Sequence, residues 1–120
     1  MDVAGFVGTP QMNFMPGLWD GSNVTVDGHA LPVGRQATAP RNVTLGVRPN
    51  DLVLAQTGLP ARIERVEDLG DSAIISVFSN GKRFKLKGPV QPSAHSGNDV
   101  FLGFAPQAAH LFDPQSGGRL

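Results

Sequence analysis

Short apolar stretches separated by turn residues follow one another along this 120-residue chain, and this pattern constrains its fold more than any other feature. The 15 glycines and 10 prolines favour many short elements and turns over long helices. A chain of this length folds as a single domain with one modest core. We therefore expect an all-β fold.

The clearest hairpin signal lies between residues 71 and 87. Apolar residues alternate with others along Asp71–Phe78, and Ser79-Asn80-Gly81 is a tight-turn sequence that leads into Arg83–Lys87. The alternation predicts that Ala73, Ile75 and Val77 lie on one face of the first strand, with Ile74, Ser76 and Phe78 on the other. Along the second strand, Phe84 and Leu86 point one way and the basic residues the other. A second hairpin is expected where Asp27-Gly28, a pair suited to positive φ, joins Asn23–Asp27 to Ala30–Val33.

Other strands are expected at regular intervals along the rest of the chain. The apolar alternation of Pro60–Leu69 slips in phase, which predicts a bulge or bend. Regular short strands with turns between them are typical of a sandwich or barrel, and a closed sheet has no unpaired edges. The remaining expected strands are Val43–Val47, Leu52–Leu54, Asp99–Phe104 and His110–Phe112, with single helical turns at Asn50-Asp51 and Pro106–Ala109.

The N-terminal residues predict a joint between two parts of a larger protein. A short apolar helical stub (Val3, Phe6, Val7) ends at Gly8-Thr9-Pro10, because proline and the residue before it do not fit a helix interior. One helical turn is not stable alone in water. We therefore expect residues 1–13 to be the end of a longer interdomain helix and its joint.

Composition and charge exclude several classes of function. Ten basic and ten acidic side chains cancel, so no global field attracts nucleic acid or anionic lipid. The absence of cysteine excludes disulfides and thiol chemistry. No apolar run is long enough to span a bilayer, and no secretion signal opens the sequence, so we expect a soluble, cytoplasmic chain.

No motif for catalysis or for a cofactor is recognisable. The phosphate-binding pattern Gly-x-x-x-x-Gly-Lys-Ser/Thr is missing, so we expect no ATP site in these residues. His29, His95 and His110 lack the spacing of a helical metal pair, so we expect no metal site. Ser96 and Asp99 near His95 provide residue types of a hydrolase triad but no nucleophile elbow.

Three strings stand out in this order: Val3–Phe14, Leu45-Gly46-Val47-Arg48-Pro49, and His110-Leu111-Phe112-Asp113 with Gly118-Arg119-Leu120. Together they resemble the regulatory domain that follows the nucleotide-binding domain in ATPase subunits of carbohydrate-importing ABC transporters, the maltose and glycerol-3-phosphate importer type. The resemblance covers essentially the whole chain. That family usually has Glu-His where this chain has Asn50-Asp51, so no role of that histidine carries over.

The resemblance implies an oligonucleotide-binding-like (OB-like) barrel of the TOBE or MOP type over residues 14–120, with strands in 14–33 as candidates to complete a second small barrel. It implies a non-catalytic regulatory and dimerisation role at the cytoplasmic face of the membrane. The implied partners are a second copy, the subunit's own nucleotide-binding domain, which holds ATP and Mg²⁺, the permease subunits and a regulatory protein. The candidate contact residues are Phe6, Gly8, Thr9, Pro10, Met12, Phe14, Arg48, His110 and Phe112.

Some of these residues also have purely structural interpretations. Arg48 could hold carbonyls or a carboxylate at a barrel corner, and Phe14 and Phe112 could be ordinary core residues. A small-oxyanion barrel of the molybdate type is an alternative function, with the loop Ser93–Asn98 as its candidate site. A single-stranded nucleic-acid barrel is another, because Lys82, Arg83, Lys85 and Lys87 crowd one hairpin. Phe84 points to the opposite face from these cations, and acidic neighbours such as Glu64 are available to pair with them, so we favour a solvated face.

Overall fold

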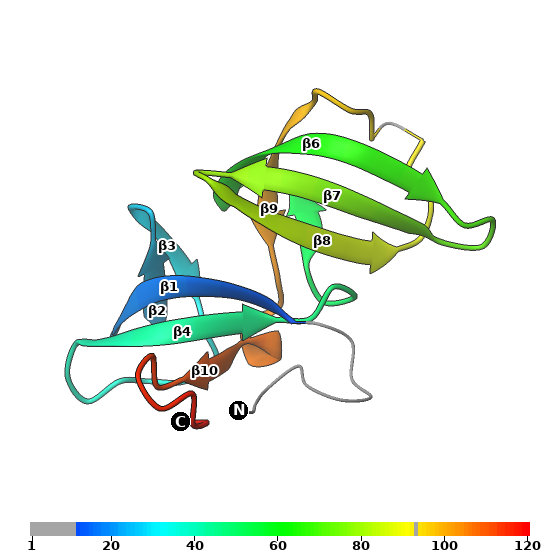
Figure 1. Ribbon diagram of the computed structural model, residues 1–120. Coiled ribbons are helices and arrows are strands. Elements are labelled where there is room, and N and C mark those ends of the chain that lie inside the picture. Colours follow the sequence, from blue (N-terminus) through cyan, green and yellow to red (C-terminus); the bar gives the residue numbers. More distant parts are fainter. Residues whose placement is uncertain (1–11, 93) are drawn as a thin grey trace. The chain divides into compact units, whose positions relative to one another are not determined.

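The computed structural model describes residues 12–92 and 94–120, and within them it confirms the all-β expectation (Figure 1). These residues form ten strands and one 3₁₀ turn, η1 at Pro106–Ala108. The turn confirms the expected helical turn before the last strand, whereas Asn50-Asp51 forms only a hydrogen-bonded turn. The helical stub predicted around Val3–Val7 lies outside the described residues.

The chain divides into two compact units, each built on one antiparallel five-stranded sheet. The first unit comprises residues up to Arg48 together with Phe104–Leu120, and the second comprises Pro49–Gly103. The chain therefore leaves the first unit after four strands, β1 to β4, and returns to it with the last strand, β10. The prediction of one OB-like domain over residues 14–120 is not tested by this division.

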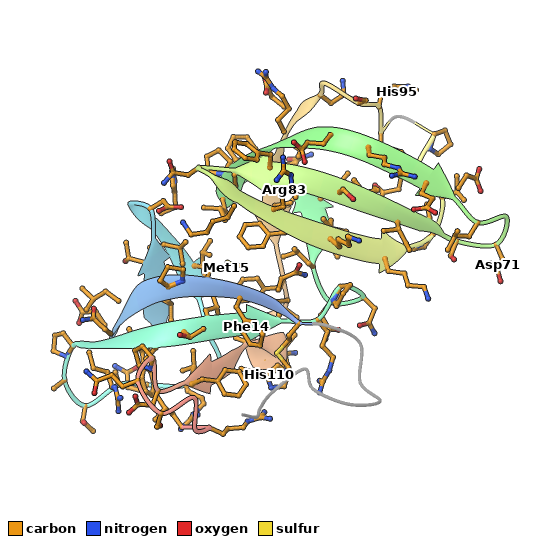
Figure 2. The ribbon with its side chains drawn as sticks, viewed as in Figure 1. Phe14, Met15, Asp71, Arg83, His95 and His110 are labelled. Carbon is orange, nitrogen blue, oxygen red and sulfur yellow. The ribbon has the colours of Figure 1, made fainter. Side chains whose placement is uncertain are left out.

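The first sheet has the strand order β10-β4-β1-β2-β3. Its inward face is the core of the unit, and Met15, Leu45 and Leu111 are all at most 1% exposed (Figure 2). The sidedness follows from the period of two along each strand, which turns every second residue inward. The strands are β1 Asn13–Asp20, β2 Asn23–Val26, β3 His29–Pro32, β4 Arg41–Val47 and β10 His110–Phe112.

The second sheet has the order β5-β9-β6-β7-β8 and is visibly curled, as an OB-like sheet is (Figure 1). The alternation predicted for the long hairpin is confirmed, since Ile75, Val77 and Phe84 are at most 3% exposed. Leu59, Ile63 and Leu102 complete this core. The strands are β5 Val53–Ala55, β6 Leu59–Asp68, β7 Ala73–Ser79, β8 Lys82–Gly88 and β9 Asp99–Gly103.

Both predicted hairpins are confirmed by their turn geometry. Asp27 and Gly28 have φ of 51° and 83°, and Asn80 and Gly81 have φ of 46° and 83°. Positive φ at both central residues defines the type I′ turn, whose twist matches that of the paired strands. Local sequence therefore fixes the register of β2 with β3 and of β7 with β8.

The predicted bulge lies in β6, where the register with β7 shifts between Ile63 and Arg65. The extra residue, Glu64, restores the apolar phase, so that Val66 pairs with Ile75. One inserted residue reverses the side to which every later residue points. Glu64 itself lies on the outer face, next to the buried Ile63, and its carboxylate accepts a 2.9 Å hydrogen bond from Arg83 on β8.

Strand β1 is longer than the sequence pattern indicated. It continues from Phe14 through Pro16 and Gly17 to Asp20. Residues 13–17 pair only with β4, because the pairing with β2 begins at Leu18. A proline is tolerated there because a strand without a neighbour on one side has no ladder bond to lose on that side.

Gly58 lies where the backbone approaches β9 of the second unit too closely to leave room for a side chain. Its φ is +136°, and a Cβ there would lie 2.2 Å from the Leu102 carbonyl oxygen. We expect Gly58→Ala to lower the free energy of unfolding by more than about 1 kcal/mol, since the backbone must move. Gly88→Ala is the control, because nothing lies within 4 Å of its Cβ position, and its change should stay within about 0.5 kcal/mol. Equal urea-denaturation midpoints for the two variants would contradict this interpretation.

Candidate functional site

Three strands of the first sheet bring residues from distant parts of the sequence into one row. Phe14 on β1 pairs with Gly46 on β4, and Gly46 pairs on its other side with His110 on β10. The next row contains Thr44 between Pro16 and Phe112. Because residues in register share a face, the outer face of this sheet gathers Phe14, His110 and Phe112 around Gly46 (Figure 2).

Gly46 has no side chain, and its neighbours fill the space that one would occupy. A Cβ at this position would lie 2.6 Å from the Met12 sulfur, 3.0 Å from Phe112 Cε2 and 3.2 Å from Phe14 Cε1. The two rings meet edge to face, with centroids 5.9 Å apart and planes at 76°. Met12 and Phe112 are buried by this packing, whereas Phe14 stays 38% exposed. The result is an apolar surface with one accessible aromatic ring.

A cationic group borders this apolar surface. Nη1 of Arg48, at the end of β4, lies 3.2 Å from His110 Nε2. The other ring nitrogen, Nδ1, contacts Nη2 of Arg119, whose guanidinium carbon lies 5.8 Å from the centre of the Phe112 ring. We call the six residues Met12, Phe14, Arg48, His110, Phe112 and Arg119 the aromatic–arginine cluster.

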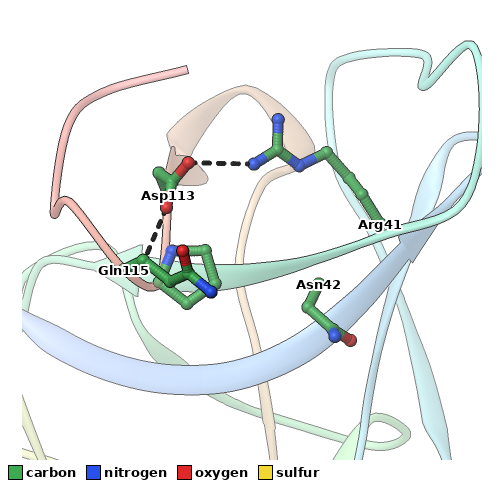
Figure 3. Close-up of a pocket in the computed structure, with 5 residues that line it drawn as sticks. Arg41, Asn42, Asp113 and Gln115 are labelled. Carbon is green, nitrogen blue, oxygen red and sulfur yellow. Dashed lines mark hydrogen bonds and ion pairs between the residues drawn. The ribbon is translucent and has the colours of Figure 1, made fainter.

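A tight turn after β10, with Asp113 at its start (Figure 3), places Arg119 beside His110. Oδ1 of Asp113 accepts hydrogen bonds from the backbone N–H groups of Gln115 and Ser116, at 2.8 and 3.2 Å. The backbone then folds back, so that Arg119 bridges to Phe112 and the Leu120 N–H donates to the Leu111 carbonyl at 2.9 Å. This Asx turn is the local reason that residues nine apart, His110 and Arg119, meet.

The turn carboxylate is itself held by charge. The Gln115 and Ser116 amides, with a smaller contribution from the nearby Arg41 guanidinium, lower the pKa of Asp113 from its ordinary value of 3.8. Arg41 donates to Oδ2 of Asp113 at 3.3 Å, across a pocket that Asn42, Pro114 and Gln115 also line (Figure 3). The positive charge of Arg41 is therefore neutralised by Asp113, and the residues that line this pocket stabilise the turn.

The two arginines of the cluster differ from Arg41 in their partners. Among the described residues, the polar partner of Arg48 and of Arg119 is the same imidazole, and neither guanidinium contacts a carboxylate. In the described part of the chain, three other arginines pair with acids, namely Arg41 with Asp113, Arg62 with Asp99 and Arg83 with Glu64. The cluster is thus a place where positive charge accumulates beside exposed aromatic surface.

The structure brings together all the sequence-predicted contact residues that it describes, namely Met12, Phe14, Arg48, His110 and Phe112. The others, Phe6, Gly8, Thr9 and Pro10, lie outside the described residues. Sequence reasoning missed Arg119 as a member of the site. The signal was present, since Asp113-Pro114 begins a turn and Gly117-Gly118 allows the chain to fold back toward β10.

The alternative sites are less suited to the roles considered for them. In the loop after Ser93, the backbone N–H groups of Ala94, His95, Gly97 and Asn98 already donate to protein acceptors, so they are not available to an oxyanion. In the basic hairpin, Phe84 is buried and Arg83 pairs with Glu64, as the sequence indicated. Over the described residues, no group of three histidines and carboxylates has the arrangement of a metal site. In that same part, no helix has the length and apolarity to span a membrane.

Comparison with known families assigns both halves of the sequence. Residues 8–52 match the MalK OB fold domain, and residues 45–112 match the TOBE domain. The second match covers more than half of the chain. The chain belongs to the TOBE domain family. The two matches overlap at β4, so Gly46 and Arg48 lie in both, while Arg119 lies beyond either.

The relatives that match this TOBE domain are ATP-binding proteins of ABC transporters. An uncharacterized ABC transporter ATP-binding protein, y4oS of Sinorhizobium fredii, is 36% identical over 124 residues. The sn-glycerol-3-phosphate import ATP-binding proteins UgpC of Ruegeria sp. and Salmonella typhimurium are 35% and 30% identical. Each alignment covers 98% of this chain and 33% to 35% of the relative, so the chain spans about a third of the length of these proteins.

Asp113 gives the cluster a testable dependence on pH. A lowered folded-state pKa means that the carboxylate stabilises the fold above the unfolded-state pKa near 3.8, and that this stability is lost as pH falls through the folded value. Asp113→Asn keeps an oxygen acceptor for the turn but removes the charge. We therefore expect it to unfold more easily than the parent chain at pH 6, and the difference to shrink as the pH falls below the unfolded-state pKa of 3.8 and through the lower folded-state pKa.

Urea denaturation from pH 2.5 to 7 measures this effect. Arg41→Gln is the control, because it removes the ion pair but leaves the amides of the turn, which are the larger cause of the shift. It should retain most of the pH dependence. A constant difference between parent and Asp113→Asn over the whole range would contradict the assignment.

Proposed function

We propose that this TOBE domain is the non-catalytic, C-terminal regulatory part of the ATP-binding subunit of an ABC importer for sugars or related solutes, with sn-glycerol 3-phosphate as one candidate. Its work is to hold two ATPase subunits together and to receive regulators. ATP and Mg²⁺ belong to a separate nucleotide-binding domain. The subunit would lie at the cytoplasmic face of the membrane, bound to permease subunits.

The observation that supports this proposal best is the pairing of two family matches along one short chain. The MalK OB fold and TOBE matches follow each other with an overlap of eight residues, 45–52, and relatives named as ABC transporter ATP-binding proteins align over 98% of the chain. The chain itself carries no phosphate-binding loop. A role in holding and sensing is consistent with a domain without recognisable chemistry of its own.

The aromatic–arginine cluster is the surface that we assign to subunit contact. Phe14 exposes an aromatic ring in the middle of a largely packed apolar surface, and arginines border it. Aromatic residues and arginine are the types enriched at interface hot spots. A contact between two identical surfaces around a twofold axis need not break while nucleotide sites elsewhere open and close.

The gene that encodes this chain provides the first test. We expect the coding sequence before Val3 to contain a Gly-x-x-x-x-Gly-Lys-Ser/Thr loop at the start of a helix, as phosphate binding requires. Genomic sequencing of that region decides the matter. A reading frame that carries no such loop would overturn the importer assignment, whatever the properties of the isolated TOBE domain.

Subunit contact is tested in the full-length ATPase subunit by sedimentation without nucleotide. Phe14→Ser should raise the dimer dissociation constant about tenfold or more, because an interface aromatic is lost. Phe101→Ser is a matched control, since Phe101 is 40% exposed on β9 of the other sheet. Thermal unfolding verifies that both variants fold. Equal dissociation constants for the two variants would remove the cluster from the contact.

A further inference from the structure

The turn that joins β7 to β8 contains the one place in the sequence where a glycine follows an asparagine, Asn80-Gly81 (Figure 1). Both residues are exposed, and their φ angles are 46° and 83°. Within the described part of the chain, no protein group forms a hydrogen bond with the Asn80 side chain or with the Gly81 N–H. The amide carbon of Asn80 and the backbone nitrogen of Gly81 are thus neighbouring reactive groups that no other contact restrains.

We propose that Asn80 is a site of spontaneous covalent modification, in which its side-chain amide is lost through a cyclic imide. The Gly81 nitrogen forms a bond with Cγ of Asn80, and the bond from Cγ to Nδ2 breaks. The proton of the Gly81 nitrogen passes through solvent to the departing nitrogen, so that ammonia leaves. Water is the only co-reactant, and it then opens the imide. Attack of water at the side-chain carbonyl yields aspartate, whereas attack at the backbone carbonyl yields isoaspartate, in which the main chain runs through the side-chain carbons.

The glycine after Asn80 makes this attack possible. A side chain on the following residue would shield the attacking nitrogen, whereas Gly81 has none and nothing lies within 4 Å of the place where its Cβ would be. The backbone must rotate to close the ring, and glycine permits a wide range of φ and ψ. The two reacting atoms belong to adjacent residues, so the reaction is intramolecular and needs no encounter between molecules.

The other asparagines lack this combination. Asn50 and Asn98 are exposed, but each precedes an aspartate, whose side chain shields the backbone nitrogen. The side-chain oxygen of Asn98 also accepts a 2.8 Å hydrogen bond from the His95 N–H. The remaining three lie in strands, where ladder hydrogen bonds restrain the backbone, and they precede Phe14, Val24 and Val43.

The modification changes both the charge and the geometry of the hairpin. Either product adds one negative charge to a segment that continues with Lys82 and Arg83. Isoaspartate also lengthens the main chain between Ser79 and Lys82, the pair that closes the ladder of β7 with β8. The two-residue type I′ loop fixes the register of these strands, and a longer loop no longer matches it. We therefore expect the isoaspartate form to be less stable than the parent chain.

The reaction is measured by incubating the 120-residue chain in mildly alkaline buffer, with and without urea, followed by digestion and peptide mass spectrometry. An isoaspartyl carboxyl methyltransferase, which methylates isoaspartate but not ordinary L-aspartate, quantifies that product. In the folded chain we expect ammonia loss at Asn80 to be at least about tenfold faster than at Asn50 or Asn98, because glycine leaves the nitrogen unshielded. Equal rates at these three asparagines, or loss at Asn80 in urea alone, would overturn the proposal.

Two variants separate the modification from other effects of incubation. Asn80→Gly removes the amide but keeps a sequence suited to the type I′ turn, so its urea-denaturation midpoint should not change during incubation. Asn80→Asp carries the charge of the products on an ordinary main chain. The purified isoaspartate form should unfold at a lower urea concentration than Asn80→Asp. Equal midpoints for these two proteins would contradict the expected loss of register. Circular dichroism before incubation verifies that both variants are folded.

Discussion

The pairing of β10 with β4 is the interaction on which the first unit and its candidate site depend. It joins residues 44–46 to residues 110–112, across more than sixty positions of sequence. The pairing buries Leu111 against Leu45 on one face of the sheet. On the other face it places His110 beside Gly46 and Phe112 beside Thr44. One set of backbone hydrogen bonds thus completes a core and assembles a surface.

Gly46 decides what kind of surface this is. A side chain at that position would collide with Met12 and crowd both Phe14 and Phe112, so the apolar group could not close over the strand. The absence of one Cβ therefore lets three elements contribute to a single apolar surface. Its polar border has a separate origin, because the Asp113 turn folds the following residues back and supplies Arg119.

The partners of the surface arginines differ between the two sheets. On the second sheet Glu64 pairs with Arg83 and Asp99 pairs with Arg62, so these acidic and basic side chains neutralise each other. On the first sheet Arg48 and Arg119 share an imidazole instead of an acid. Solvent-exposed ion pairs contribute little to stability, so the second sheet's pairs mainly remove net charge. Among the described residues no carboxylate contacts Arg48 or Arg119, and their two positive charges beside aromatic rings are the reason to look for function there.

Local sequence by itself determined the positions of the strands other than β1, both hairpins, the bulge in β6 and the alternation of faces along β7 and β8. Each of these depends on residues within a few positions of each other, such as Asn80-Gly81 or the alternation around Ile75. Resemblance to a family, and not periodicity, pointed to Met12, Phe14, Arg48, His110 and Phe112, and the family matches confirm the resemblance.

Only the tertiary structure decided that these five residues meet, that the chain forms two units, and that Arg119 joins the group. The full length of β1 was not predictable, because Pro16 and Gly17 both have low strand propensity. They are tolerated there because this part of β1 pairs with β4 but not with β2. Long-range pairing depends on which strands find each other in three dimensions. Local propensity depends only on residues close together in the sequence. It can therefore show which residues form strands, but not which strands become neighbours.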